Sequence, residues 1–284
     1  MAGFTLLELS IVLIIIGLIA GGILVGQDLI NAAGERAQIT QIEKYNQAVN
    51  TFRGKYNALP GDMDTATANL FGFGHRGSFA GEGDGNGIIE GNSQNRSGFN
   101  DGNVEVTGET VMFWSDLTYA NGMNIGLIEG NFNTGSETAF PAGNYIYPTQ
   151  LSLYYPPSIL GNGNYVYVWS SKLFVNYFGV SKISYCNPQI YSSPGMTVHD
   201  AYYIDKKVDD GLPQTGRVIA MYMNGSAGWG QWAGAGTGNP VAYYTATSGS
   251  ASTCFDNNGA TGIMNYSIKQ NNGSGMNCAL SFQF

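Results

Sequence analysis

The stretch LSIVLIIIGLIAGGILVGQ, residues 9–27, decides how the chain is organised. Its nineteen residues are all uncharged, and with the residues back to Phe4 it is long enough, as a helix, to cross a bilayer core of about 30 Å. No Lys or Arg precedes Arg36, and the apolar run passes directly into further helix, which is not the pattern of a cleaved secretory signal. The sequence therefore predicts one transmembrane helix that stays on the protein.

Glu8 is the one charged residue inside this apolar segment. An ionised carboxylate there costs several kcal/mol unless a cation pairs with it. No Lys or Arg of the same chain lies within helical reach, so a salt bridge along the helix is not available. Two interpretations remain: Glu8 pairs with a cation from elsewhere, or it lies at the level of the lipid headgroups.

The run GFTLLELSIVL, residues 3–13, resembles the class III signal of type IV pilins and type II secretion pseudopilins. The resemblance implies that a prepilin peptidase cuts between Gly3 and Phe4 and that Phe4 becomes the N-methylated first residue. It also implies that the new amine of Phe4 is the cation for Glu8 of the neighbouring protomer. That contact would select the next subunit and set its register.

The resemblance also implies a fold and a division of the chain. The fold class is α+β, the pilin fold, in which a long N-terminal helix packs on an antiparallel β-sheet with long loops. Residues 1–3 would be a leader, 4–26 the transmembrane and filament-core helix, 27–58 its amphipathic continuation, and 59–284 the globular head. The short leader has no basic residue, so the positive-inside rule gives no orientation.

Two pairs of glycines, Gly17 with Gly21 and Gly22 with Gly26, have small-xxx-small spacing on the membrane helix. Such spacing lets helices approach closely, although each Gly weakens the helix by about 1 kcal/mol relative to Ala. Helices of the family often melt locally in this zone. The resemblance therefore implies that residues 17–26 pack in the centre of a filament.

Beyond the membrane segment, apolar residues recur at spacings of three and four, which places them on one face of a helix ending before Pro60. They are Ile42, Tyr45, Val49, Phe52 and Tyr56. Amphipathic helices usually bury such a stripe in their own domain, so we expect it in the core of the head rather than in a seam between subunits. The opposite face would meet neighbouring subunits or solvent, and carries Arg36, Glu43, Lys44, Arg53 and Lys55.

The charge of the chain is concentrated in one block. The net charge is −8, and residues 62–137 hold eleven acids against only Arg76 and Arg96. Such a chain cannot supply the phosphate-neutralising contacts of nucleic-acid binding, so we expect no nucleic-acid partner. Although only 11% of the residues are charged and 41 are Gly, the 13% of aromatic residues supplies apolar surface for a packed, β-rich core.

Within the head, a second helix is predicted near Gly108–Ala120. Strands are predicted where aromatic and β-branched residues gather, at residues 165–169, 174–178 and 217–223. A short helix from Ala201 should close with Gly211 at its C′ position, because Pro213 prevents continuation. We expect the neighbouring Asp209 and Asp210 to end this helix rather than to bind a cation.

The stretch EGDGNGIIE alternates oxygen-bearing side chains with Gly, as calcium loops do. The candidate Ca²⁺ ligands are Glu82, Asp84, Asn86 and Glu90. Ser93 occupies the twelfth position, where an EF-hand has a bidentate Glu, so the loop is not an EF-hand. The alternative is an acidic hydrated loop. No other cofactor is expected.

Three cysteines allow at most one internal disulfide. The C-terminal segment from Cys278 resembles the terminal disulfide strand of pilins, which implies a bridge between Cys254 and Cys278. Cys186 would then be a buried thiol. Closing this loop should contribute on the order of 3 kcal/mol.

No catalytic motif is present, because neither His75 nor His199 belongs to an HExxH pair and no G-x-S-x-G elbow occurs. We therefore expect no enzyme. The resemblance implies a structural subunit of a type IV pilus-like filament, a homo-oligomer handled by inner-membrane assembly machinery and located first in that membrane and then outside the cell or in the periplasm. The alternatives are a type II secretion pseudopilin and a membrane-anchored calcium- or ligand-binding protein that never polymerises.

Overall fold

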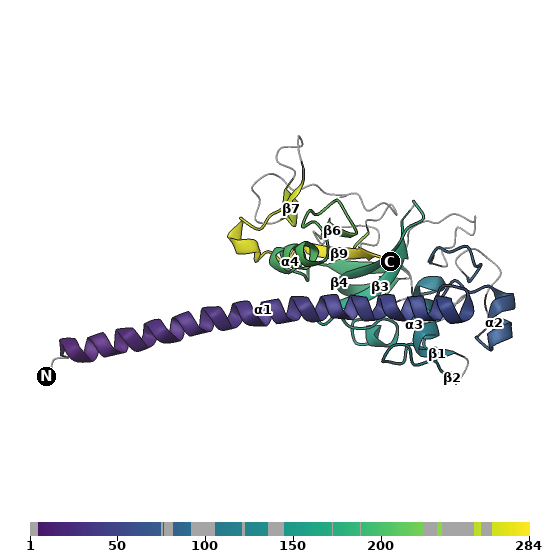
Figure 1. Ribbon diagram of the computed structural model, residues 1–284, viewed down its shortest axis with the longest axis horizontal. Coiled ribbons are helices and arrows are strands. Elements are labelled where there is room, and N and C mark those ends of the chain that lie inside the picture. Colours follow the sequence, from purple (N-terminus) through teal and green to yellow (C-terminus); the bar gives the residue numbers. More distant parts are fainter. Residues whose placement is uncertain are drawn as a thin grey trace.

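A computed structural model describes residues 5–74, 76, 82–91, 106–120, 123–135, 145–171, 173–187, 189–223, 232–234, 253–256 and 263–284. The chain is α+β, as the sequence predicts, with a long N-terminal helix and an antiparallel sheet of five strands. Figure 1 shows the first half of this helix projecting beyond the head, with the start of the helix far from it.

Helix α1 spans Leu6–Tyr56 without interruption. Its 51 residues correspond to a length of about 77 Å. Thr5 caps its start, and Asn57, with a left-handed φ of 54°, caps its end shortly before Pro60. The predicted end of the helix is therefore confirmed, and the glycine zone of residues 17–26 is helical in the isolated chain.

The second half of α1 packs on the head through the predicted apolar stripe, all five residues of which are buried. Tyr45 meets Trp114 with ring centroids 5.0 Å apart, and Phe52 is fully buried against Phe73. The five charged residues expected on the opposite face are all exposed. The stripe thus belongs to the core of its own chain, as expected.

The central sheet has the strand order β3-β4-β9-β6, and β5 pairs with the far end of β4. All pairings are antiparallel. The strands are β3 Asn164–Ser170, β4 Asn176–Asn187, β5 Gln189–Ser193, β6 Val218–Tyr222 and β9 Cys278–Gln283. Two small two-stranded sheets accompany it, formed by β1 Tyr119–Ala120 with β2 Met123–Asn124 and by β7 Phe255–Asp256 with β8 Asn265–Tyr266.

Three further helices belong to the head, α2 Thr65–Phe71, α3 Glu109–Thr118 and α4 Val198–Val208. Short 3-10 turns lie at Leu151–Leu153 and Asn271–Gly273. The second predicted helix is confirmed as α3, whose Phe113 and Trp114 are completely buried beside Phe178 of β4.

The predicted bounds of one strand and one helix are wrong at both ends: β4 runs on to Asn187, and α4 starts at Val198 rather than Ala201. The strand expected from Phe174 starts at Asn176, because Phe174 lies in the turn after β3 with a φ of 61° and an exposed side chain. Helix α4 ends at Val208, so Gly211 lies two residues beyond the C-cap Asp209 rather than at C′. The Gly211 amide instead donates a hydrogen bond to the carboxylate of Asp205 at 3.1 Å.

The predicted disulfide is confirmed. Cys254 and Cys278 are bridged, with Cα atoms 5.0 Å apart, and Cys186 is a free, buried thiol. Burial raises the pKa of the Cys186 thiol well above its ordinary value. The bridge ties the segment before β7 to the first residue of β9, which lies in the middle of the central sheet.

Replacing both Cys254 and Cys278 with Ser should lower the unfolding free energy by about 3 kcal/mol, because the bridge restricts the unfolded chain. Urea unfolding of the full chain in detergent, followed by tryptophan fluorescence, measures the change. Wild type under reducing conditions is the matched control and should unfold at the same midpoint as the variant. Equal midpoints for the variant and the oxidised wild type would rule out a stabilising bridge.

Candidate functional sites: the stem and the carboxylate loop

The first half of α1, residues 6–30, is called the stem below, and no residue of it is buried. Among the described residues, α1 is the one helix long and apolar enough to cross a membrane. Leu6 is 87% exposed, and every large apolar side chain after it as far as Ile30 is at least half exposed. The prediction of a transmembrane helix is compatible with this arrangement, because nothing described in the chain covers the stem.

The stem glycines make no close contact with any other described part of the chain. A Cβ added at Gly17, Gly21, Gly22 or Gly26 would meet nothing within 4 Å. Each of them nevertheless weakens the helix by about 1 kcal/mol relative to Ala. Since no contact within the described chain requires these glycines, any benefit must come from surfaces outside it.

Glu8 lies in the first turn of the stem, where it completes a capping box with Thr5. The Thr5 amide and hydroxyl both donate to Glu8 Oε2 at 2.8 Å, and the Glu8 amide donates to the Thr5 hydroxyl at 3.3 Å. Sequence reasoning missed this role, although the Thr-x-x-Glu spacing is its signal. Gly3 and Phe4, the predicted cleavage and methylation residues, lie outside the described residues.

A buried acid marks the point where the stem enters the head. Glu35 is 2% exposed, forms an ion pair with Lys207 of α4, and lies 3.4 Å from His199 Nδ1. Asp200 also approaches this group, but its carboxylate accepts a hydrogen bond from the Thr197 hydroxyl at the start of α4. Lys207 already supplies the positive charge that Glu35 requires, so this ion pair holds α1 and α4 together. No sequence motif indicated it.

The predicted calcium ligands do not form one ring. Glu82 and Glu90 are buried, whereas Asp84 and Asn86 are exposed. The Asn86 side-chain amide donates to Asp84 at 3.0 Å and to Glu90 at 3.4 Å. Asp84 also lies in a cluster with two acids that the prediction did not include, Asp62 and Glu109, with one oxygen of each within 4.8 Å of the others.

Backbone amides of the loop surround Asp62, which lies between α1 and α2. Its carboxylate accepts hydrogen bonds from the amides of Gly85, Asn86 and Gly87 at 2.9, 3.0 and 2.7 Å. Burial raises the pKa of Asp62 to about 7, and the charge of Asp84 acts in the same direction, against the lowering effect of the amides.

Glu109, the first residue of α3, is enclosed by the same loop. Its two carboxylate oxygens accept hydrogen bonds from the amides of Gly83 and Glu90, both at 2.9 Å. The loop is thus folded around two buried carboxylates, with amide protons as their donors. Calcium binding at this loop stays a prediction.

If calcium binds here, Asp84 should be its most sensitive ligand, because it alone belongs both to the loop pattern and to the carboxylate cluster. Isothermal calorimetry of the full chain in detergent should show calcium binding at micromolar to millimolar concentration, weakened at least tenfold by Asp84→Asn. Glu43→Gln, an exposed acid on α1, is the matched control and should change nothing. No heat across that range would end the calcium hypothesis.

Asp209 and Asp210 act as the predicted helix stop. Asp209 accepts hydrogen bonds from the amides of Arg217 and Val218, and Asp210 accepts from the Leu212 amide at 2.8 Å and the Thr215 hydroxyl at 2.5 Å. Both carboxylates are therefore occupied in holding the turn between α4 and β6.

Comparison with known proteins assigns the chain to no family. No protein-family model, no curated protein and no solved structure matches the chain. The observed arrangement, a long apolar N-terminal helix packed on an antiparallel sheet, is compatible with the pilin-like fold that the resemblance of residues 3–13 implies.

Proposed function

We propose that this chain is the structural subunit of a type IV pilus-like filament. It would be inserted in the inner membrane, cut before Phe4 by a prepilin peptidase, and passed by membrane assembly machinery into a homopolymer outside the cell or in the periplasm. The observation that carries the proposal is the contrast within α1. Residues 35–56 bury their apolar face in their own head, whereas the stem buries nothing.

The size of the uncovered surface limits what the stem can do. Burying one Leu, Ile or Val side chain contributes about 1.5–3 kcal/mol, so covering the whole stem is worth roughly tens of kcal/mol. A bilayer or other copies of the stem can supply this cover. A chain that leaves the membrane must exchange the cover of the bilayer for that of other stems. Polymerisation is therefore the physical condition for export.

Glu8 and the stem glycines favour the polymer over a permanent lipid anchor. A carboxylate in the apolar zone requires a cation, and the freed amine of Phe4 in a neighbouring copy would provide it. The glycines let helices approach closely, which a helix surrounded only by lipid does not need. The closest alternative, a pseudopilin of a secretion system, shares these features and differs in where the polymer is found.

Negative-stain microscopy of material sheared from cells, with gold-labelled antibody against the head, tests the proposal. The expected result is fibres that carry the label along their length. If the chain remains in the membrane fraction while no labelled fibre appears on the surface or in the periplasm, the anchored alternative is correct and the proposal fails.

A further inference from the structure

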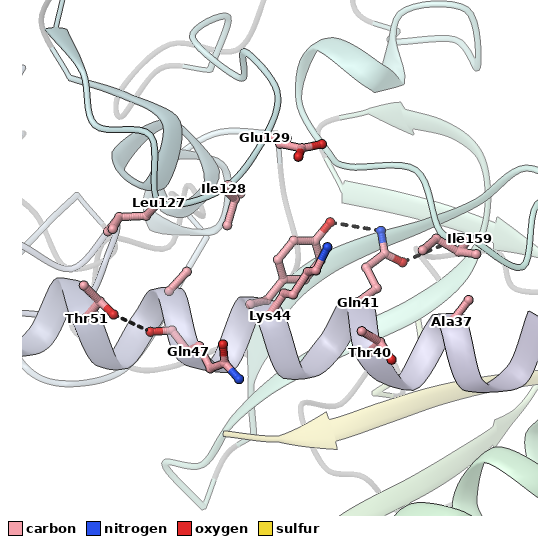
Figure 2. Close-up of a pocket in the computed structure, with 12 residues that line it drawn as sticks. Ala37, Thr40, Gln41, Lys44, Gln47, Thr51, Leu127, Ile128, Glu129 and Ile159 are labelled. Carbon is pink, nitrogen blue, oxygen red and sulfur yellow. Dashed lines mark hydrogen bonds between the residues drawn. The ribbon is translucent and has the colours of Figure 1, made fainter.

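Two grooves run along opposite flanks of α1 where it meets the head. The first flank has a groove of about 600 Å³ between helix residues such as Gln41 and Lys44 and the segment Leu127–Glu129 (Figure 2). The second flank has a groove of about 290 Å³ between Glu43 of the helix and the start of β6. Successive helical residues diverge by about 100°, which turns Lys44 and Glu43 toward different flanks.

The first flank is held in shape by its own hydrogen bonds. Gln41 donates to the Tyr45 hydroxyl at 3.0 Å and to the Pro157 carbonyl at 2.9 Å, and it accepts from the Ile159 amide at 3.2 Å. These bonds fix the head loop against the helix, as Figure 2 shows for the side chains around Gln41. The charged residues of the groove take no part in them.

The two flanks carry opposite arrangements of charge. One has a base on the helix and an acid on the head, and the other has an acid on the helix and a base on the head. On the first flank the helix contributes Lys44 and the head contributes Glu129. On the second flank the helix contributes Glu43 and the head contributes Arg217. All four residues are exposed, and within the described part of the chain none of their side chains forms an ion pair or a hydrogen bond. The other base of the second groove, Lys207, is already paired with Glu35.

We propose that the first flank of one copy faces the second flank of the next, pairing Glu129 with Arg217 and Lys44 with Glu43. The inference rests on the proposed filament, in which all copies leave one membrane with their stems parallel. In that orientation, contact between two first flanks would bring Glu129 against Glu129 and Lys44 against Lys44. Contact between unlike flanks brings opposite charges together on both the helix and the head.

A contact between unlike surfaces does not close on itself. Each bound copy presents a fresh flank to the next, so the association continues beyond a dimer, and an axial shift between copies makes it an open helical polymer rather than a ring. The same-flank contact that would give a two-fold dimer is the one that like charges oppose. The charges on the two flanks therefore favour an open polymer over a two-fold dimer.

The axial register is compatible with these pairs. If Glu8 faces the Phe4 amine of its neighbour, successive copies are shifted by four helical residues, about 6 Å. Lys44 and the neighbour's Glu43 are then three or five residues apart along the axis, about 5–8 Å, according to the hand of the filament. Extended side chains span this distance. Exposed ion pairs contribute only about 0–1 kcal/mol each. They therefore determine which flanks of two copies meet, while burial of the stems supplies most of the binding free energy.

Charge reversal in the full chain, expressed with its assembly machinery, tests the pairing. Glu129→Arg and Arg217→Glu should each lower the yield of sheared polymer at least fivefold, and the double variant should return to within twofold of wild type. Lys269→Glu is the matched control, because Lys269 is exposed and lines neither groove, and it should leave the yield unchanged. Membrane levels of each variant show that the subunit itself is intact.

Cysteine cross-linking identifies the partner surface directly. A chain carrying both Glu129→Cys and Arg217→Cys should give a ladder of cross-linked multimers in sheared material, and either substitution alone should give none. A cross-linked dimer from Glu129→Cys alone, or reversals that leave polymer yield unchanged, would overturn the flank pairing while the filament stands. If wild type yields no polymer, the filament proposal fails and the pairing fails with it.

Discussion

Replacing Glu8 with Gln should reduce the yield of sheared filaments at least tenfold while leaving the amount of membrane-inserted subunit unchanged. The proposed partner of this carboxylate is the freed amine of Phe4 in the next copy. Without the carboxylate, that amine enters the apolar filament core unpaired, at a cost of several kcal/mol. Immunoblots of sheared and membrane fractions from the same cells measure the effect.

The choice of Gln separates two roles of Glu8. A Gln at this position still completes a capping box with Thr5, so it removes the charge and keeps the helix start. Thr5→Val is the matched control, because it removes the cap and keeps the charge. We expect Thr5→Val to assemble within about threefold of wild type, since an N-cap is worth about 1 kcal/mol. Normal filaments from Glu8→Gln would show that the carboxylate serves only as a cap.

Asp116→Ala should lower the unfolding free energy of the chain by about 3–5 kcal/mol. Asp116 of α3 is 1% exposed, and its carboxylate accepts from Arg76 Nη2 at 2.6 Å and from the Gly61 amide at 2.8 Å. The side chain of Arg76 is fully buried. Removing Asp116 therefore takes one paired anion from a buried guanidinium and takes its side-chain acceptor from the buried Gly61 amide.

Urea unfolding in detergent measures this loss through tryptophan fluorescence, to which the buried Trp114 of the same helix contributes. Glu129→Gln is the control, because an exposed acid without a described ion pair should change the free energy by no more than about 0.5 kcal/mol. A loss below 1 kcal/mol for Asp116→Ala would show that the ion pair does not hold Arg76 to α3.

The helical parts of the fold were predictable because their signals are local. The apolar run from Leu9 and the spacing from Ile42 to Tyr56 depend only on helical periodicity, and both the exposed stem and the buried stripe follow from them. The capping box of Thr5 is equally local and could have been read from its spacing. The disulfide was predictable only through the resemblance of the segment from Cys278, because spacing alone does not choose among three cysteines.

The carboxylate loop shows what the sequence could not provide. Its amides bind Asp62, more than 20 residues earlier, and Glu109, about as many later. Nothing local in either acid indicates that a Gly-rich loop will enclose it, and the acidic pattern of the loop predicted a cation without Asp62 or Glu109. The pairing of Glu35 with Lys207 is hidden for the same reason, since 172 residues separate the partners.

The most direct test of the account is whether copies of the stem cover one another. A Leu13→Cys chain in sheared material should react with a water-soluble maleimide at least tenfold more slowly than a Lys269→Cys chain, and at a comparable rate once a denaturant has dissociated and unfolded the fibres. Cys186 is buried and the other cysteines are bridged, so background labelling is low. Equal labelling rates in intact sheared material would contradict a filament built on buried stems.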